Sequence, residues 1–165
     1  VVTQQTIPPD AGEDGISARQ RWMRTLAAAD PGALAAAWQD WTPKPDVQAI
    51  RGPETGLVMV RGRADGGGAR FNLGEATVTR ATVRLRGEQL SGDATGTSYV
   101  LGTDAEHARL AAIFDGLLTD TGQRARVLAE VIAPLDLERA EREAARRAEA
   151  RSTRVDFFTV ARENS

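Results

Sequence analysis

The arginines of two segments that we expect to pair as strands are the side chains best suited to bind a ligand. Even spacing puts Arg61 and Arg63 on one face of the first segment, and Arg80 and Arg84 on one face of the second. If these faces coincide, the guanidinium groups form a row that could hold phosphate-type anions or a partner's carboxylates through forked hydrogen bonds. The alternative is a solvated sheet face whose arginines pair with Glu and Thr neighbours.

The one histidine, His107, stands near the start of an expected helix. A lone imidazole could act as a general base or as a metal ligand. A metal site would need further ligands such as Asp104, Glu54 or Glu75, and the sequence has no HxxxH or HxH spacing. We therefore expect a surface or interface histidine rather than a catalytic one.

Other candidate groups carry weaker signals. Glu54, Glu75 and Asp65 could include a general acid and base, but linear spacing cannot place two carboxylates at a working separation. The glycines at 66–68 invite a phosphate-loop interpretation, yet no Lys-Ser or Lys-Thr pair follows them. A strand-like segment comes next, so a hairpin loop is the better interpretation.

Composition excludes several kinds of site. The chain has no cysteine, so it holds no disulfide, thiolate metal site, iron-sulfur cluster or cysteine nucleophile of its own. Its formal net charge is -2, so no global positive field exists to gather nucleic acid or an anionic membrane. Lys44 is the only lysine among 21 basic residues, and guanidinium suits interfaces; genome base composition is the other explanation.

The length of 165 residues indicates one domain. Residues 1–15 contain prolines, glycines and few apolar groups, which predicts a disordered leader before a single domain over residues 16–163. No apolar run approaches the length of a membrane span, and no secretory signal opens the chain. We therefore expect a cytoplasmic protein.

A pair of helices should position the rest of the domain. Ser17 and Gln20 form a capping-box pattern, which predicts a helix over residues 17–29. Asp30 can cap a second helix with Pro31 in its first turn, and the prolines at 43 and 45 end it. These elements form an N-terminal helical pair.

The middle of the chain changes to strand-like patterns. Residues 47–51, 56–63, 75–85 and 97–101 are rich in Val and Thr, partly alternating, and broken by glycines. Their connections are too short for helical crossovers, so we expect an antiparallel meander packed with helices. The fold class is therefore α+β.

The second half returns to helix and ends in a possible arm. Asp104 should cap a helix to about residue 118, and a second should start after Asp120 or Thr121 and stop before Pro134. Residues 136–151 form a polar helix, and residues 154–160 form a strand with apolar groups on both faces. This helix plus strand is either an arm that packs on another chain or the closing edge of the domain's own sheet.

Several ordered segments resemble the PhnG family, the small G subunit of the bacterial carbon-phosphorus lyase system for phosphonate breakdown. The resemblance covers residues 18–162 and departs from the family in a longer leader and an expanded loop over residues 86–96. The resemblance rests on the following residues: ARQRWM (18–23), PETGLV (53–58), RFNLGEATVTRA (70–81), YVLG (99–102), Asp104, His107, IAPL (132–135) and STRVDFFT (152–159).

The resemblance implies an accessory subunit of a core complex with the H, I and J subunits. In that pathway a phosphonate displaces adenine from ATP, giving a ribose 1-phosphonate 5-triphosphate. It implies no catalytic residue and no cofactor in this chain, with ATP used by the complex. Arg61, Arg63, Arg80, Arg84, His107, Glu54 and Glu75 therefore remain candidate anion or interface contacts that rest on spacing alone.

Two other functions stay open at this point. One is a small acid/base hydrolase that acts alone and uses His107 with a carboxylate. The other is a homo-oligomeric binding module. Turnover by the purified chain would distinguish the first, and a stable symmetric oligomer would distinguish the second.

Overall fold

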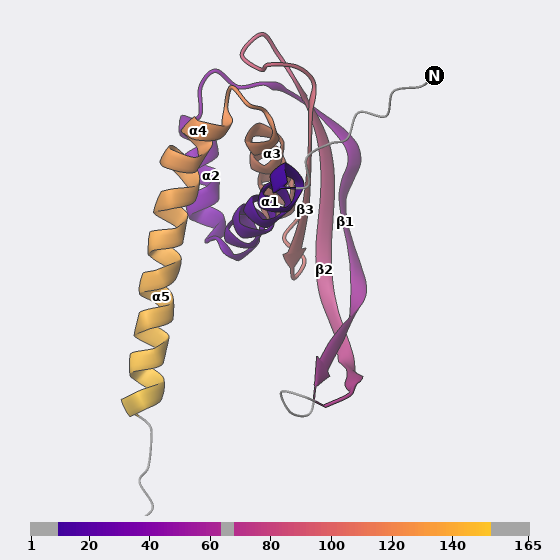
Figure 1. Cartoon of the computed structure of the whole chain (residues 1–165), viewed down its shortest axis with the longest axis vertical. Helices are drawn as coiled ribbons and strands as arrows, with labels where there is room; N and C mark the ends of the chain where they lie inside the picture. Colours follow the sequence, from indigo (N-terminus) through magenta and orange to yellow (C-terminus); the bar gives the residue numbers. More distant parts are fainter. Residues whose placement is uncertain (1–9, 64–67, 153–165) are drawn as a thin grey trace, which may run out of the picture.

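The chain folds into a layer of helices on one face of a three-stranded antiparallel sheet (Figure 1). The computed structural model describes the backbone of residues 10–63 and 68–152, and the side chains of residues 15–63 and 68–150. The sheet order is β1-β2-β3, with strands Asp46–Arg63, Arg70–Arg86 and Ala94–Leu101. The observed class is the predicted α+β fold, an antiparallel meander with helices.

Helix α3, Ala105–Thr119, forms the centre of the core. It lies against the sheet, and α1 and α2 pack on its other sides, so apolar side chains are needed nearly all round it. The stripe predicted from sequence is buried: Leu110, Ile113, Phe114 and Leu117 are all 1% exposed or less. Asp104 caps the helix by accepting a hydrogen bond from the backbone N–H of His107, as its sequence position predicts.

The sheet differs from the prediction in its first half. The two segments expected at residues 47–51 and 56–63 are one strand, β1, which runs 18 residues beside β2. Register irregularities between Ala49 and Arg51 and between Arg51 and Glu54 absorb the Gly52-Pro53 break without ending the strand. A glycine-containing break therefore bends this strand and does not divide it.

The N-terminal helical pair is present, with one boundary changed. Helix α1, Asp10–Ala28, begins seven residues before Ser17, inside the segment expected to be a leader; the other leader residues, 1–9, lie outside the described residues. Helix α2, Pro31–Asp40, begins where predicted, and the Asp30 carboxylate accepts a hydrogen bond from the backbone N–H of Ala33.

The last helical region continues through Pro134, where the sequence predicted a stop. Helix α4 (Arg124–Val127), a π-helical turn η1 (Leu128–Ile132) and α5 (Ala133–Ser152) follow one another without a break. In the wide turn the Ala133 N–H donates a hydrogen bond to the Leu128 carbonyl. Pro134 follows in the first turn of α5, a position where a helix tolerates a residue without an N–H. Local accommodation by the π turn explains why this proline does not end the helix.

The polar helix predicted over residues 136–151 is present as α5, which extends past the other helices (Figure 1). The strand predicted at residues 154–160 lies outside the described residues. None of the helices in the described part combines the length and apolar character that crossing a membrane requires.

Candidate interaction surface on the sheet and hairpin

The face of the sheet away from the helices carries the candidate binding side chains. Strand alternation turns Thr79, Ala81, Val83 and Leu85 of β2 into the core, while Arg80 and the other residues between them point to the opposite face. The same alternation on β3 places Tyr99 outside, where it stands opposite Arg80 and is 54% exposed. An antiparallel sheet with one covered face gives this pattern.

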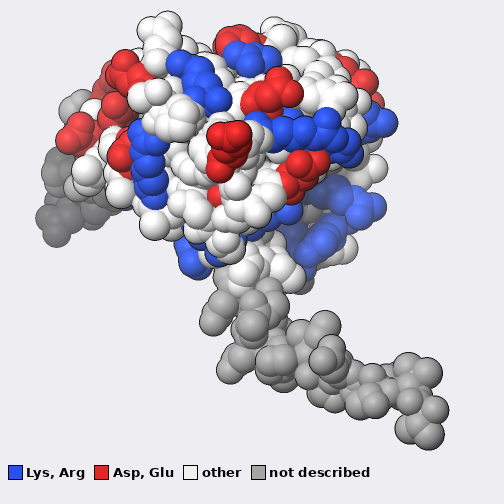
Figure 2. All heavy atoms as spheres, turned by 90° about the horizontal axis from the view of Figure 1, so that it is seen from above, with Lys and Arg blue, Asp and Glu red and all other residues white. Residues whose placement is uncertain are grey.

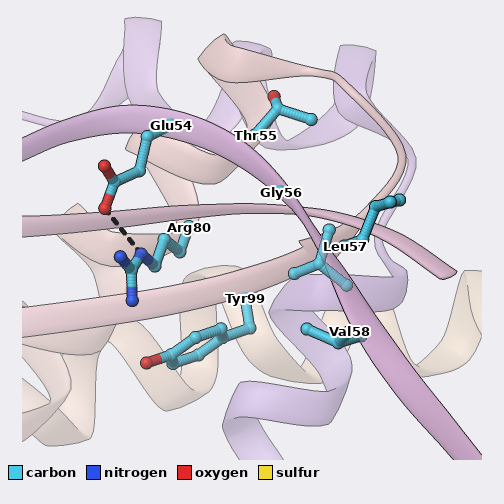
Figure 3. Close-up of a pocket in the computed structure, with 8 residues that line it drawn as sticks. Glu54, Thr55, Gly56, Leu57, Val58, Arg80 and Tyr99 are labelled. Atoms are coloured by element: carbon cyan, nitrogen blue, oxygen red, sulfur yellow. Dashed lines mark hydrogen bonds and ion pairs between the residues drawn. The ribbon is translucent and has the colours of Figure 1, made fainter. Parts of the chain in front are cut away.

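A charged cluster forms where β1 passes Arg80. The Arg80 Nε lies 2.6 Å from Glu54 Oε1, and the Arg51 Nε lies 3.3 Å from the same oxygen. Close by, Tyr99 and Val58 help to line an open hollow of about 280 Å³, in which Figure 3 shows the Glu54 and Arg80 side chains facing one another. Because Glu54 already accepts a hydrogen bond from Arg80 and forms an ion pair with Arg51, this hollow is not a free anion site.

The predicted row of four arginines does not form. In the register of β1 and β2, Arg61 stands opposite Asn72, whereas Arg80 stands opposite Glu54 and Arg84 opposite Gln48. Asn72 and Arg80 are eight positions apart on β2, about 27 Å at roughly 3.4 Å per residue. The even spacing was correct within each strand, but the pairing register separates the two pairs.

The distal pair of arginines lies at the tip of the hairpin. Arg63 stands opposite Arg70, and Arg61 donates a 3.3 Å hydrogen bond from Nε to the Asn72 side chain. No ion pair within the described ranges involves Arg61, Arg63 or Arg70. Strands β1 and β2 pair antiparallel up to Arg63 and Arg70, as the hairpin interpretation predicted, and residues 64–67 lie outside the described residues.

His107 is not a surface histidine, which corrects the prediction. Its side chain is in the core, 5% exposed, and its Nε2 lies 2.8 Å from the Leu26 carbonyl oxygen, which fixes that nitrogen as the donor. It therefore joins α3 to the end of α1. A ring held in this way has no open path to a substrate, so the geometry gives the hydrolase alternative no general base here.

Glu54 and Glu75 do not form an acid/base pair. Glu75 stands opposite Met59, whereas Glu54 stands opposite Arg80. Five positions separate residues 75 and 80 on β2, which places the two carboxylates on opposite faces and about 17 Å apart along the strand, at roughly 3.4 Å per residue. General acid/base work on one bond needs a much smaller separation.

A buried carboxylate that the sequence analysis missed ties the domain together. Asp115 of α3 accepts hydrogen bonds from Arg19 Nη2 at 2.7 Å, Trp22 Nε1 at 2.9 Å and the Thr97 backbone N–H at 2.9 Å. The hydrogen bond to Asp115 raises the pKa of Arg19. In the sequence, the signal for this buried site was a single aspartate inside the apolar run of α3. With all its contacts supplied by the protein, Asp115 is a structural group.

A surface ion pair near the start of α3 shifts the ionisation of its members. Arg109 donates to both oxygens of Glu106, at 2.8 and 2.7 Å. The hydrogen bond from Arg109 lowers the pKa of Glu106, and that from Glu106 raises the pKa of Arg109. The pair stabilises the charged forms at the helix start and takes no part in the hollow.

The exposed apolar side chains of the β1–β2 hairpin were also missed. We define the distal hairpin as residues 56–63 and 70–76, the part that extends past β3 and past helices α1, α2 and α3 in Figure 1. Its large apolar side chains are each at least 40% exposed: Leu57, Val58, Met59, Val60, Phe71 and Leu73. Four consecutive apolar residues in a strand indicate cover on both faces, and the run at 57–60 carried that signal.

Two comparisons relate the chain to known proteins. A family model described as "Phosphonate metabolism protein PhnG" matches residues 17–163. A protein of Rhizobium meliloti (strain 1021), named alpha-D-ribose 1-methylphosphonate 5-triphosphate synthase subunit PhnG, is 51% identical over 151 residues. The aligned region covers 90% of this chain and 91% of that protein.

Proposed function

This chain belongs to the PhnG family of phosphonate metabolism proteins, and from that premise we propose that it is an accessory subunit of an alpha-D-ribose 1-methylphosphonate 5-triphosphate synthase. The synthase transfers a phosphonate to C1 of the ribose of ATP and releases adenine. Residues 16–163 act as one unit in this role. The observation that carries the proposal is the 51% identity to a named subunit over an alignment that covers 90% of this chain and 91% of that protein.

The geometry supports an accessory role rather than a catalytic one. His107 is buried in the core and hydrogen-bonded to the Leu26 carbonyl, and Arg80 is ion-paired with Glu54 on the face of the sheet away from the helices. The two candidate carboxylates, Glu54 and Glu75, are on opposite faces of the sheet. In the described part of the chain, the candidate groups do not converge on one point where a reacting atom could sit.

The neighbouring subunits supply the chemistry in this proposal. We place the chain in a complex with the H, I and J subunits of the carbon-phosphorus lyase system, in the cytoplasm, with ATP bound by the complex. This chain itself holds no cofactor. Its contribution is surface: the helix-free face of the sheet, the distal hairpin and the polar helix α5 are exposed and available to partners.

Arginines at a subunit boundary could still contact the substrate. Arg63 and Arg84 have no carboxylate partner within the described ranges, whereas Arg80 does. If one of them binds phosphate, its replacement by Ala lowers synthase activity and leaves assembly intact. Equal loss of assembly and activity assigns that arginine to the interface.

Reconstitution tests the proposal. The other subunits are combined with ATP and methylphosphonate, with or without this chain, and adenine release is measured. We expect release only when the chain is present. Full release without it, or turnover by this chain alone that is lost in His107→Ala, would overturn the accessory role.

A further inference from the structure

We propose that the distal hairpin inserts between surfaces of another subunit of the synthase, in a cleft with apolar walls and an acidic rim. The inference rests on the proposed function for the presence of such a subunit. The hairpin's own features define the partner's chemistry: apolar groups on both faces, an unpaired strand edge and a positively charged tip.

The distal hairpin needs cover on both of its faces. The β1 register places Val58 and Val60 on the helix-free side of the pleat and Leu57 and Met59 on the other, and all four are exposed. Leu73 is a further apolar side chain of the hairpin, with 60% of its surface exposed. An isolated two-stranded hairpin gains little stability alone, so a long one with two apolar faces indicates a partner that surrounds it.

The outer edge of β1 adds backbone groups to this surface. In the described sheet β1 pairs with β2 alone, so its other edge has unpaired N–H and C=O groups along 18 residues. The irregularities that disturb this edge lie at residues 49–54 and 60–61, and the register from Thr55 to Val60 is continuous. A regular, undisturbed edge of this kind can accept an extended segment by strand addition.

The charge of the hairpin selects an acidic partner. The distal hairpin carries three arginines and one carboxylate, Glu75, although the whole chain has a formal charge of -2. Arg61, Arg63 and Arg70 gather near the tip without an ion pair among the described residues. At the opposite end of the molecule, basic and acidic side chains are interspersed (Figure 2).

The same charges disfavour a second copy of this chain as the occupant. Two hairpins that packed on one another would bring together two arginine-rich elements, and like charges at an interface are unfavourable. A different subunit with carboxylates around an apolar cleft satisfies the tip arginines, the apolar faces and the β1 edge together. The interaction surface is therefore heterologous.

Binding measurements on the full chain test this assignment. The apolar variants are Leu57→Asp and Met59→Asp, with Ile16→Asp as the matched control, because Ile16 is an exposed apolar residue on α1 at 62%. The charge variant is the double change Arg61→Glu with Arg63→Glu, with Arg24→Glu on α1 as its control. Circular dichroism and unfolding temperature show that each variant is folded.

Affinity for the co-expressed remaining subunits should fall at least tenfold in the hairpin variants and stay within about twofold in the controls. Higher salt should weaken the wild-type complex more than the double arginine variant. Hairpin variants that bind like the wild type would overturn the inference. So would a wild-type dimer that forms without the other subunits and dissociates in Met59→Asp.

The outcomes also separate this inference from the function on which it rests. If the wild-type chain neither joins the other subunits nor supports adenine release, the proposed function fails. If the wild type does both and the hairpin variants do so equally well, only the hairpin assignment is wrong.

Discussion

Trp22 on α1 and Asp115 on α3 are joined by a buried hydrogen bond of 2.9 Å between the indole Nε1 and a carboxylate oxygen. The same carboxylate also accepts from Arg19 of α1 and from the Thr97 backbone of β3. One side chain thus connects two helices and a strand. Its loss affects all three, because each donor would be left without its acceptor.

We expect Asp115→Ala to lower the free energy of unfolding by about 2 to 6 kcal/mol, because the Trp22 indole and the Thr97 N–H each lose an acceptor at about 1 to 3 kcal/mol. Arg19→Ala should cost less, because 43% of the Arg19 side chain is exposed and Asp115 keeps its other two donors. Urea titration monitored by tryptophan fluorescence measures both. Equal effects of the two variants would contradict the central position of Asp115.

The contact between β3 and α3 predicts a severe effect at one glycine. A Cβ at Gly96 would collide with the Ala112 carbonyl oxygen and the Gly116 backbone nitrogen. Gly96→Ala should therefore destabilise the chain by about 3 kcal/mol or more, since backbone atoms cannot move aside as a side chain can. Gly92→Ala is the control, because nothing lies within 4 Å of its added Cβ. Similar melting temperatures for the two variants would contradict the packing described.

The position of His107 predicts a loss of stability without a loss of chemistry. His107→Ala removes a core side chain and leaves the Leu26 carbonyl without this donor, which should cost about 2 to 3 kcal/mol. Complexes assembled with the variant well below its melting temperature should retain adenine release within about twofold. A general base would instead lose about a hundredfold or more. Thermal unfolding and initial rates measure the two effects separately.

The Glu106–Arg109 pair predicts a small dependence of stability on pH. Because the pKa of Glu106 is lowered in the folded chain from its ordinary value of 4.5, the pair stabilises the fold at pH values above 4.5. That contribution is lost as the pH falls through the lowered pKa. Glu106→Gln should therefore cost a few tenths of a kcal/mol near neutral pH, with a difference from wild type that shrinks in acid. A difference that grows below pH 4.5 would contradict the direction of the shift.

Local signals in the sequence predicted the local parts of the fold. Asp30 and Asp104 cap helices because each places a short side chain with an acceptor oxygen directly before the helix. The two helices, α2 and α3, start where the sequence predicted. The stripe of α3 and the antiparallel order of the strands also follow from pattern and connection length. These features depend on residues close together in the chain.

The features that sequence could not supply depend on distant contacts. The separation of Arg61 from Arg80 is set by the pairing register, which includes an irregularity between Val60 and Arg61 that the residue types do not specify. His107 is placed by a carbonyl 81 positions away, and Asp115 by an arginine 96 positions away. Family resemblance gave the function because it does not depend on placing these residues. The site hypotheses did depend on placing them. The structure separates the two arginine pairs and the two carboxylates, and it pairs Arg80 with Glu54, as the alternative of a solvated sheet face expected.

The π-helical turn at Leu128–Ile132 also fixes the direction in which the side chains of α5 point. Relative to a regular α-helix, such a turn acts as an inserted residue, and each residue of a helix advances the azimuth by about 100°. Within the wide turn each residue advances by less than this, so the extra residue is absorbed there, and deleting it would restore ordinary winding while leaving the arginines of α5 near their present side of the helix. Within a family, one-residue alignment gaps at this point would therefore correspond to a regular α-helical turn, with the exposed faces of α5 kept.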